Sequence, residues 1–313
     1  MAELYLGLDI GGTKVAVGLV DGAGRVAAQA RRSTESLRQE GEFVPALLRL
    51  ARSVAGERPA GVGIALPGPV DPRRGVIRRA PRNQELEGVP LAEICAQELG
   101  CPAVADNDAN CAALAEARFG AGRGAASLAY FTVSTGIGGG FIVEGRPLSG
   151  RQGTAAEFGH VILSPQGPRC DCGGRGCLEA LASGSAIARS AREAAAAVPG
   201  SRLASAEFLA GRPLDAARVD EAAQAGDAAA QRVWEEAMTW LGLGVATVIN
   251  VLDPAVVVLG GGVTAAGERL LVPVRRVVAE RCMPDIARET PIRQAELGAE
   301  VGIVGAAALV MGQ

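Results

Sequence analysis

The first stretch of the chain consists mainly of apolar residues and is interrupted by a pair of glycines. The run from Leu4 to Ile10 predicts a strand, and the run from Lys14 to Val20 predicts a second strand after the glycines. Asp21-Gly22 follows at once, and this pair is typical of a tight hairpin turn. The pattern therefore predicts that the chain opens with a β-hairpin whose turn holds two glycines.

The same order of elements returns near the middle of the chain. Ser127 to Val133 predicts a strand, Ser134 to Gly140 a glycine-rich turn, and Phe141 to Val143 a short strand before a turn at Glu144-Gly145. This approximate repeat indicates two related domains that each offer a glycine turn to one ligand. The alternative is a chance pairing of two common hairpins.

Helical and strand-like segments alternate through the rest of the chain. Asp227 to Asn250 carries apolar residues along one stripe and predicts a long helix that ends at Asp253-Pro254. Alternating strands and helices indicate an α/β fold. Because no Gly/Ser linker separates the halves, we expect two domains that pack around a cleft. The other predicted helices and strands are Glu42–Ala55, Leu91–Leu99 and Cys111–Ala117, and Gly61–Leu66 and Ala255–Leu259.

Composition places the chain among ordinary globular proteins. Its 313 residues predict about two domains, and 49% apolar and 21% charged residues exclude the disordered and fibrous classes. A net charge of −3 without a long basic run gives no electrostatic footprint for nucleic acid or an anionic membrane. We expect a cytoplasmic location, because neither a secretory signal nor a membrane-spanning segment is recognisable.

Three glycine-rich elements at the ends of predicted strands point to bound phosphate. In Asp9 to Lys14 the glycines let backbone N–H groups approach phosphate oxygens, and the carboxylate of Asp9 suits Mg²⁺. Ser134 to Gly140 adds two hydroxyls and four glycines, and Gly260 to Gly262 follows an apolar strand. The spacing matches neither a Walker A loop nor a dinucleotide fingerprint. Each loop alone suits an ordinary hairpin, but the three together favour a nucleotide.

A polar segment, Asp106 to Asn110, follows a short apolar run and precedes a predicted helix. Ligand clefts of α/β proteins lie at such strand-to-helix junctions. A carboxylate there can accept the proton of a substrate hydroxyl that attacks a γ-phosphoryl group. The alternative is helix capping by Asp or Asn, although four polar residues in five exceed what a cap requires.

Three of the chain's seven cysteines are clustered in sequence, and its single histidine precedes them. Three thiolates and one imidazole match a closed, tetrahedral structural zinc site, and the intervening glycines allow a tight loop. Such a zinc would hold Glu157 and Glu179 in place. A redox role lacks the C-x-x-C spacing, and incidental cysteines are the other alternative. The expected ligands are His160, Cys170, Cys172 and Cys177, and the expected core cysteines are Cys95, Cys101, Cys111 and Cys282.

Seven motifs, in this order along nearly the whole chain, resemble the ROK family of sugar kinases and repressors. They are D-I-G-G-T-K from Asp9, L-P-G-P-V-D from Leu66, D-N-D-A-N from Asp106, S-T-G-I-G-G-G from Ser134, E-F-G-H from Glu157, C-D-C-G-G-R-G-C-L-E from Cys170 and V-L-G-G-G-V from Val258. The resemblance implies a two-domain, actin-like ATPase fold (ribonuclease H-like) with the active site in the interdomain cleft. The expected domains are residues 1–117, completed by a C-terminal helix at 300–313, and residues 118–299 with the zinc loop. A homodimer is expected, with a tetramer as the alternative.

The resemblance also implies an activity, namely Mg²⁺-dependent transfer of the γ-phosphoryl group of ATP to the 6-hydroxyl of a hexose, glucose first. Asp108 would be the general base, and His160 would place one ring nitrogen on zinc and the other toward the sugar. The implied sugar ligands are Gly68, Asn83, Asn107, Asp108, Glu157, His160 and Glu179. The implied nucleotide ligands are Asp9, Gly11, Gly12, Thr13 and Lys14 on the first phosphate loop, Thr135 and Gly136 on the second, and Gly260 and Gly261 near the nucleoside.

One segment departs from the family pattern. The family often has Asn directly after an Ala-Pro pair and a Trp a few residues later. Here Ala80-Pro81 is followed by Arg82 and then Asn83, and Leu86 stands at the Trp position. Asn83 is expected to reach the sugar after a one-residue adjustment, or else to be an ordinary loop residue.

Other functions remain as alternatives. Kinases of N-acetylmannosamine, N-acetylglucosamine or fructose share the same elements, because discrimination at C2 depends on pocket volume. A sugar-responsive repressor would carry a helix-turn-helix before the first motif, where only eight residues precede Asp9. A non-catalytic sugar-binding or scaffold protein is disfavoured by the retained Asp9 and Asp108.

Overall fold

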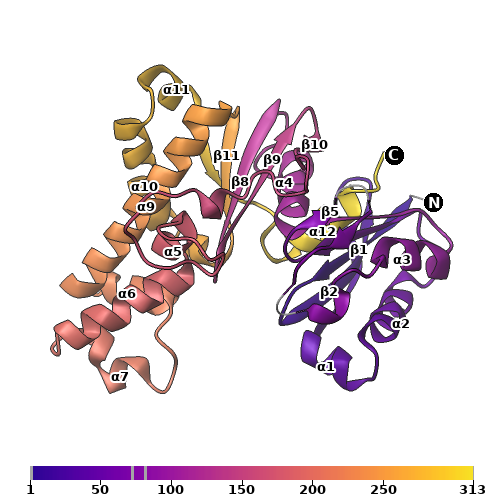
Figure 1. Cartoon of the computed structure of the whole chain (residues 1–313), viewed down its shortest axis with the longest axis horizontal. Coiled ribbons are helices and arrows are strands. Elements are labelled where there is room, and N and C mark those ends of the chain that lie inside the picture. Colours follow the sequence, from indigo (N-terminus) through magenta and orange to yellow (C-terminus); the bar gives the residue numbers. More distant parts are fainter. Residues whose placement is uncertain (1–2, 72–73, 81–82, 313) are drawn as a thin grey trace. The chain divides into compact units, whose positions relative to one another are not determined.

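The computed structural model describes residues 3–71, 74–80 and 83–312, which form two five-stranded sheets, a two-stranded sheet and the surrounding helices (Figure 1). Pro81 and Arg82 of the departing segment therefore lie outside the described residues. The strands are β1 (Leu4–Ile10), β2 (Lys14–Asp21), β3 (Val26–Ser33), β4 (Val62–Leu66), β5 (Val70–Asp71), β6 (Val76–Ile77), β7 (Ala103–Asn107), β8 (Ser127–Val133), β9 (Ile137–Val143), β10 (Arg146–Pro147), β11 (Val256–Gly260) and β12 (Ile292–Gln294).

The helices follow the strands along the chain in the alternation that the sequence predicted. The α-helices are α1 (Thr34–Gln39), α2 (Phe43–Ala55), α3 (Leu91–Leu99), α4 (Asp108–Phe119), α5 (Leu178–Ala182), α6 (Gly184–Ala197), α7 (Ala206–Leu209), α8 (Ala216–Gln224), α9 (Ala228–Leu252), α10 (Glu268–Arg281), α11 (Pro284–Glu289) and α12 (Val301–Ala308). The 3₁₀ helices are η1 (Gln84–Leu86), η2 (Phe158–His160), η3 (Arg202–Ala204), η4 (Gly262–Ala266) and η5 (Gly298–Glu300). The predicted α/β class is confirmed.

The predicted internal repeat is confirmed by the topology of the two large sheets. The first has the order β3-β2-β1-β4-β7, and the second has the order β10-β9-β8-β11-β12. In each sheet the strand that comes first along the chain, β1 or β8, is central. The next two strands along the chain lie on one side of it, and the last two lie on the other side. The pairing agrees as well, since β2–β3 and β9–β10 are antiparallel whereas β4–β7 and β11–β12 are parallel. Two hairpins that paired by chance would not share this order.

The chain divides into two compact units. Unit 1 consists of Met1–Leu128, Gly140–Ala156 and Ala295–Gln313, and unit 2 consists of Ala129–Gly139 and Glu157–Gln294. This division differs from the expected domains of residues 1–117 with 300–313 and 118–299, because residues 118–128, 140–156 and 295–299 belong to unit 1.

The glycine row of unit 1 is a line of three glycines on neighbouring strands, Gly63, Gly7 and Gly18. Gly7 is in register with Gly63 of β4 and with Gly18 of β2. A Cβ at Gly63 would lie 1.6 Å from the carbonyl oxygen of Ala306, and one at Gly7 would lie 2.1 Å from that of Ile303. Helix α12 thus rests directly on the sheet backbone, and Figure 1 shows this yellow helix beside the indigo strands of the first sheet. The opposite face packs against α2 and α3.

The prediction of the long helix is confirmed, whereas the prediction of the glycine-rich turn is wrong in part. The predicted helix Asp227–Asn250 is α9, Ala228–Leu252, and the Asp227 side chain accepts a hydrogen bond from the Ala230 N–H as its N-cap. The prediction of a turn throughout Ser134–Gly140 is wrong, because β9 begins at Ile137. A Cβ at Gly140 would lie 2.7 Å from the carbonyl oxygen of Ala109 on α4, so this glycine permits close packing inside a strand.

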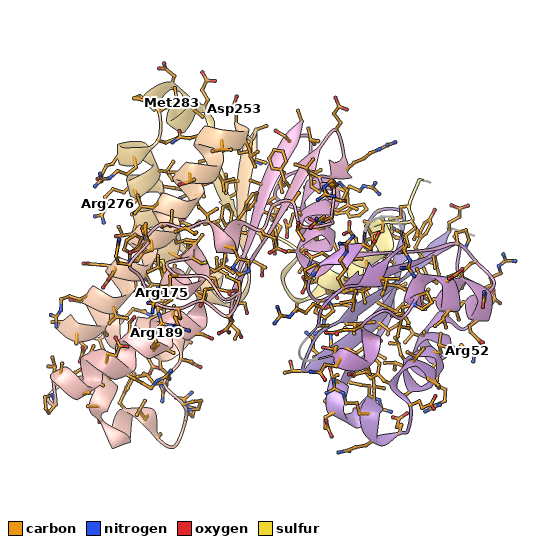
Figure 2. All side chains as sticks on the ribbon, viewed as in Figure 1. Arg52, Arg175, Arg189, Asp253, Arg276 and Met283 are labelled. Carbon is orange, nitrogen blue, oxygen red and sulfur yellow. The ribbon has the colours of Figure 1, made fainter. Side chains whose placement is uncertain are left out.

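The surface carries most of the charged side chains, as Arg52 on α2 and Arg276 on α10 illustrate (Figure 2). Within the described residues, no helix combines the length and apolar character that crossing a membrane requires.

Candidate active site and metal centre

Three polar segments of unit 1 lie at one edge of its sheet. Strands β1, β4 and β7 are parallel neighbours, so their carboxyl ends meet at the same edge. The glycine turn Gly11–Thr13 follows β1, Gly68 follows β4, and Asp108 follows β7. The sheet therefore brings together three of the segments that the sequence predicted to bind ligand.

The first glycine turn is held by two buried polar residues. The N–H of Gly11 donates to the carbonyl oxygen of Lys14 at 2.8 Å, which closes the turn. The hydroxyl of Thr34 and the amide of Asn83 both donate to the carbonyl oxygen of Gly11, at 2.9 and 3.4 Å. Both side chains are fully buried. Thr13 and Lys14 are exposed at the turn, so its outer face is open to a ligand.

Asn83 is fully buried, and its side-chain amide supports the first glycine turn through the carbonyl of Gly11. Its expected contact with the sugar stays a prediction. Sequence reasoning missed Thr34, whose only signal is a hydroxyl residue at the start of a short helix.

Two carboxyl groups of the edge are mostly buried, and burial raises the pKa of each. Asp9 is the next-to-last residue of β1, and removal of its carboxylate from water raises its pKa, whereas Lys14 and Arg31 lower it in part. Burial likewise raises the pKa of Asp106, although hydrogen bonds from the Asn110 amide and the Asn107 N–H oppose the shift. A buried carboxylate that gains a cation nearby is stabilised in its charged form.

Asn107 and Asp108 differ in exposure and in their contacts at the start of α4. The Asn107 side chain accepts hydrogen bonds from the N–H groups of Ala109 and Asn110, and its amide donates to the carbonyl oxygen of Gly68 at 3.0 Å. The capping alternative therefore holds for Asn107. Asp108 is the first residue of α4 and is exposed. The amino end of a helix favours a negative charge at this position.

The second glycine turn, Ser134–Gly136, lies in unit 2 between β8 and β9. Ser134 and Thr135 are exposed, and their carbonyl oxygens accept hydrogen bonds from the N–H groups of Gly184 and Ser185 at the start of α6. The turn is therefore anchored by its backbone while its two hydroxyls face outward. This arrangement suits contact with phosphate.

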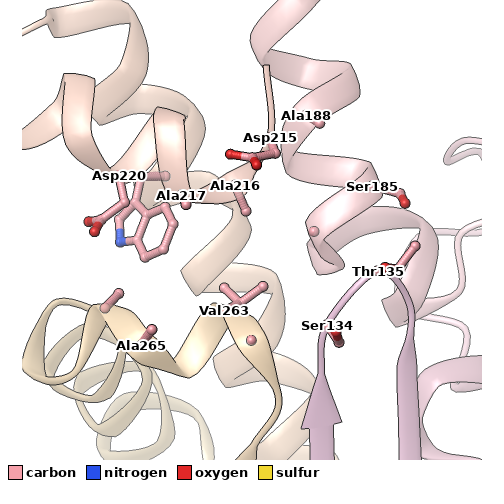
Figure 3. Close-up of a pocket in the computed structure, with 14 residues that line it drawn as sticks. Ser134, Thr135, Ser185, Ala188, Asp215, Ala216, Ala217, Asp220, Val263 and Ala265 are labelled. Atoms are coloured by element: carbon pink, nitrogen blue, oxygen red, sulfur yellow. The ribbon is translucent and has the colours of Figure 1, made fainter. Parts of the chain in front are cut away.

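A cavity of 380 Å³ adjoins this turn within unit 2. Figure 3 shows Ser134 and Thr135 at the tip of the β8–β9 hairpin, with Asp215 and Val263 on elements across the cavity. Its size lies in the range of small-molecule sites. The lining residues are Ser134, Thr135, Gly184, Ser185, Ala188, Asp215, Ala216, Ala217, Asp220, Trp234, Gly262, Val263, Ala265 and Ala266.

The walls of the cavity are fixed by an ion pair and an indole. Both oxygens of Asp220 accept from the Arg269 guanidinium, at 2.7 and 2.6 Å. The indole N–H of Trp234 donates to the carbonyl oxygen of Arg269 at 3.1 Å. Asp215 caps α8 by accepting from the N–H of Arg218. An apolar wall with a few fixed polar groups is typical of a site for a planar, partly polar ligand such as a nucleoside.

The third glycine element meets the cavity one residue later than expected. A Cβ at Gly260 would lie 2.2 Å from the Tyr130 hydroxyl, and one at Gly261 would lie 2.4 Å from the carbonyl oxygen of Val133. These two glycines therefore allow β11 and its following turn to approach β8, and Gly262 lines the cavity instead.

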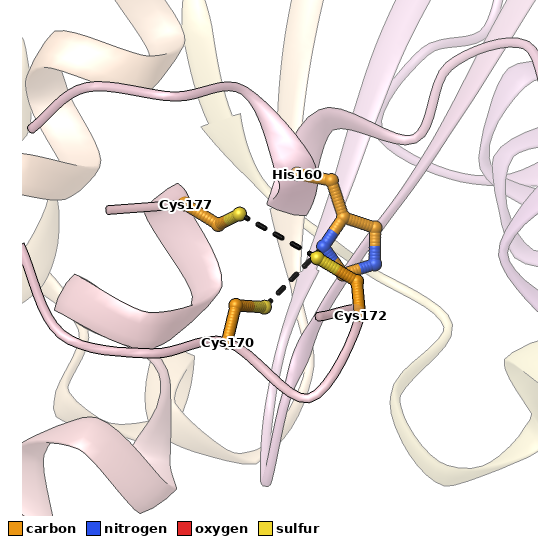
Figure 4. Close-up of side chains that lie close together, drawn as sticks. All are labelled: His160, Cys170, Cys172 and Cys177. Carbon is orange, nitrogen blue, oxygen red and sulfur yellow. Dashed lines mark hydrogen bonds between the residues drawn. The ribbon is translucent and has the colours of Figure 1, made fainter. Parts of the chain in front are cut away.

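The predicted metal ligands converge in unit 2. The donor atoms of all four lie within 4.8 Å of one another, and Figure 4 shows the side chains gathered from η2, the cysteine loop and the start of α5. The Sγ atoms of Cys172 and Cys177 are 3.7 Å apart, and Cys170 Sγ lies 3.6 Å from Nδ1 of His160. Zinc bonds of about 2.3 Å to sulfur and about 2.0 Å to nitrogen give tetrahedral edges of about 3.5 to 3.8 Å. The donor set fits zinc.

The other cysteines behave as expected. Cys95, Cys101, Cys111 and Cys282 are all free and buried. Burial raises the pKa of the Cys95 thiol to about 12. The prediction that these four are core residues is confirmed.

The two glutamates predicted to lie beside the metal differ in their contacts. Glu157 is the N-cap of η2 and is half-buried, and burial raises its pKa. The Oε2 atom of Glu179 accepts from the N–H of Ile137 at 2.9 Å, and its Oε1 atom lies 3.7 Å from Cys170 Sγ. Glu179 thus contacts both the second glycine turn and the metal cluster.

The sequence did not reveal most of the cavity. Asp215 caps α8, Asp220 lies on α8 and Trp234 lies on α9, and five of the other eleven lining residues are alanines. No motif marks such residues, because they are ordinary helix residues that meet only in the folded chain. The Asp215 cap before an alanine-rich run is the one local signal.

Comparison with known proteins extends over almost the whole chain. The ROK family model matches residues 5–313. A glucokinase of Thermotoga maritima is 37% identical over 97% of this chain and 96% of its own, and an N-acetylmannosamine kinase of Yersinia pestis is 32% identical over 96% of both chains.

A solved structure agrees with these sequence relatives. The ROK family glucokinase from Streptomyces griseus, in complex with glucose and AMPPNP, has a TM-score of 0.83 and 36% identity over 98% of both chains. The two-domain, actin-like fold implied by the motifs is confirmed by such neighbours. The family match covers far more than half of the sequence, and the chain belongs to the ROK family.

Proposed function

We propose that the chain is an ATP-dependent glucokinase, which transfers the γ-phosphoryl group of ATP to the 6-hydroxyl of glucose. The observation that carries the proposal is the common sheet edge of unit 1, where the exposed carboxylate of Asp108 and the turn Gly11–Thr13 follow parallel neighbouring strands. The turn Gly11–Thr13 suits contact with phosphate, and the carboxylate of Asp108 can accept the proton of a hydroxyl group. Full-length similarity to glucokinases supports the same activity.

Asp108 is the general base of this proposal. Its carboxylate would accept the O6 proton as that oxygen attacks the γ-phosphorus in line. Asn107 would orient this segment, because its side chain is committed to the helix cap and to Gly68. Backbone N–H groups of the turn Gly11–Thr13 would stabilise charge on the transferred group.

Unit 2 would bind the nucleoside and part of the sugar. The 380 Å³ cavity beside Ser134 and Thr135 has the size and mixed lining that a nucleoside requires. Glu157, Glu179 and Nε2 of His160 would bind sugar hydroxyls, since Nδ1 of His160 faces the cysteines.

Two metal ions complete the proposal. Asp9, as a hard oxygen ligand, would hold Mg²⁺ directly or through water, and the ion supplies positive charge to the phosphates. His160, Cys170, Cys172 and Cys177 would hold zinc, whose closed donor set leaves no position for substrate. Metal analysis should find about one zinc per chain, and folded, active protein without zinc would contradict this part.

The test of the activity is a coupled assay of Asp108→Asn against the wild type with ATP-Mg²⁺ and glucose. Loss of a general base lowers kcat by about 10² to 10⁴-fold, with an unchanged circular dichroism spectrum as the control for folding. Wild-type turnover by a folded Asp108→Asn protein would sink the assignment.

An N-acetylmannosamine kinase is the second candidate, because one such enzyme matches 96% of this chain. A panel of hexoses and amino sugars in the same assay decides between them through kcat/KM. The absence of hexose-dependent ATP consumption would favour the non-catalytic alternative. The homodimer is part of the proposal too, and light scattering of the purified protein tests it.

A further inference from the structure

The segment Cys177–Ser185 connects the metal cluster to the second glycine turn over a short stretch of chain. It begins at a metal ligand, continues as α5 and ends at the first turn of α6. The N–H groups of Gly184 and Ser185 donate to the carbonyl oxygens of Ser134 and Thr135, at 2.8 and 3.2 Å. The backbone of the glycine turn is therefore held by the same segment that supplies a ligand to the cluster.

Glu179 contacts both ends of this connection with one side chain. Its Oε2 atom accepts from the Ile137 N–H at 2.9 Å, and its Oε1 atom lies 3.7 Å from Cys170 Sγ. A Cβ at Gly136 would lie 2.4 Å from Oε2, so only glycine at that position leaves room for the carboxylate. The carboxylate thus fixes the point at which the turn enters β9.

The segment that carries His160 also contacts Ile137, the first residue of β9 after the turn. Helix η2 ends at His160, and a Cβ at Gly159 would lie 1.9 Å from the carbonyl oxygen of Ile137. The peptide groups of Ile137 are therefore confined by Glu179 on one side and by the backbone of η2 on the other. A metal ion bound by His160 and Cys177 would tie these two segments together.

We propose that Glu179 is a positioning residue through which the bound metal sets the second glycine turn for the nucleotide, so that metal and nucleotide favour each other's binding. This inference rests on the proposed function, since it assigns the cavity beside the turn to ATP. It gives Glu179 a role that is separate from contact with sugar. By linkage, the factor by which metal tightens nucleotide equals the factor by which nucleotide tightens metal.

The experiment measures AMPPNP-Mg²⁺ binding by calorimetry in the absence of sugar, which removes any effect on sugar contacts. It compares the zinc-loaded wild type, the zinc-free wild type, Glu179→Ala and Glu179→Gln. Glu193→Ala is the matched control, because Glu193 is an exposed carboxylate on the adjoining helix α6. A second measurement determines zinc affinity by competition with a chelator, with and without AMPPNP.

The expected result is a weaker nucleotide complex wherever the connection is cut. Glu179→Ala should raise the Kd of AMPPNP about 5- to 30-fold, as expected for one lost hydrogen bond. Glu179→Gln keeps a carbonyl acceptor for the Ile137 N–H, so its Kd and that of Glu193→Ala should stay within about twofold of the wild type. Zinc removal should weaken the wild type by a similar factor and Glu179→Ala hardly further. Saturating AMPPNP should raise zinc affinity by the same factor.

Two results would overturn the inference. One is equal AMPPNP affinity in zinc-loaded and zinc-free wild type. The other is a loaded Glu179→Ala protein that binds like wild type or like Glu179→Gln, and this comparison decides the matter even if the zinc-free protein unfolds. Failure of the zinc-loaded wild type to bind AMPPNP at all is a different outcome, because it refutes the nucleotide site itself and the coupling with it.

Discussion

Glu116 is a fully buried carboxylate that joins α4 to the returning C-terminal segment of unit 1. Its oxygens accept hydrogen bonds from the N–H groups of Glu296 at 3.1 and 3.2 Å, of Leu297 at 2.9 Å and of Ala121 at 2.9 Å. Residues 296 and 297 lead into η5 and α12, the helix that rests on the glycine row. The Glu116→Ala variant removes the acceptor for all these donors at once.

The magnitude follows from the number of donors and their burial. Each buried N–H group that loses its acceptor costs about 1 to 3 kcal/mol because it stays desolvated, and three such groups together give a loss of about 3 to 5 kcal/mol. We expect that loss of unfolding free energy for Glu116→Ala. Glu116→Gln retains one acceptor oxygen but turns an amide toward a donor, so we expect a loss of about 1 to 3 kcal/mol.

Urea unfolding followed by circular dichroism measures these differences, with the exposed Glu193→Ala as the control that should stay within about 0.5 kcal/mol of wild type. Hydrogen exchange at the amides of Glu296 and Leu297 locates the effect, since both should exchange faster in the Glu116→Ala variant. A Glu116→Ala protein that loses less than about 1 kcal/mol, with unchanged exchange at these amides, would refute the account of this carboxylate as an anchor.

Three further outcomes are expected from packing, cavity shape and burial. Gly63→Ala places a methyl group on the backbone of α12 and should cost more than about 3 kcal/mol in urea unfolding, whereas Gly22→Ala has open space and should be nearly neutral. Ala265→Trp places a large side chain at the wall of the 380 Å³ cavity and should raise the KM for ATP at least about tenfold in the coupled assay while the KM for glucose stays the same. The exposed Ala228→Trp, outside that cavity, is its control. The raised pKa of Asp106 means that the folded carboxyl holds its proton to a higher pH than the unfolded one, so ionising it lowers stability as pH rises from about 4 toward 7. Asp106→Asn should therefore gain stability relative to wild type over that interval, and a constant difference in thermal unfolding at all pH values would contradict this reasoning.

Local patterns predicted most of the secondary structure of this fold because their signals are carried by neighbouring residues. The strand Leu4–Ile10 has the bounds that the sequence predicted, and α9 differs from its prediction by one residue at the start and two at the end. An apolar stripe, an Asp cap and a following Asp-Pro pair all lie within one segment there. The packing of α12 against β1 had no such signal, since the two segments are far apart in the chain.

The metal centre and the cavity show the same contrast within one unit. Cysteine and histidine are rare ligand types, so their spacing alone predicted a cluster that the structure assembles. Asp220 and the alanines of the cavity are common residue types on separate helices, and Trp234 is a buried helix residue like its apolar neighbours. Nothing in their local sequence distinguishes these residues from other surface or core positions. A site made of common residue types becomes visible only when the helices are placed.

Glycine is the residue type for which sequence and structure differ most instructively. The sequence counted three glycine-rich elements as evidence for phosphate, yet Gly140, Gly260 and Gly261 each allow a close backbone approach to a neighbouring element. The glycine row under α12 likewise allows close approach of a helix, and no sequence motif marks it. The turns that contain Gly11 and Gly136 also carry exposed hydroxyl residues, although Gly136 in addition leaves room for the carboxylate of Glu179. Because glycine has no side chain, it allows close approach of either a ligand or another backbone segment. A glycine therefore predicts phosphate binding only where the backbone N–H groups of its turn face outward.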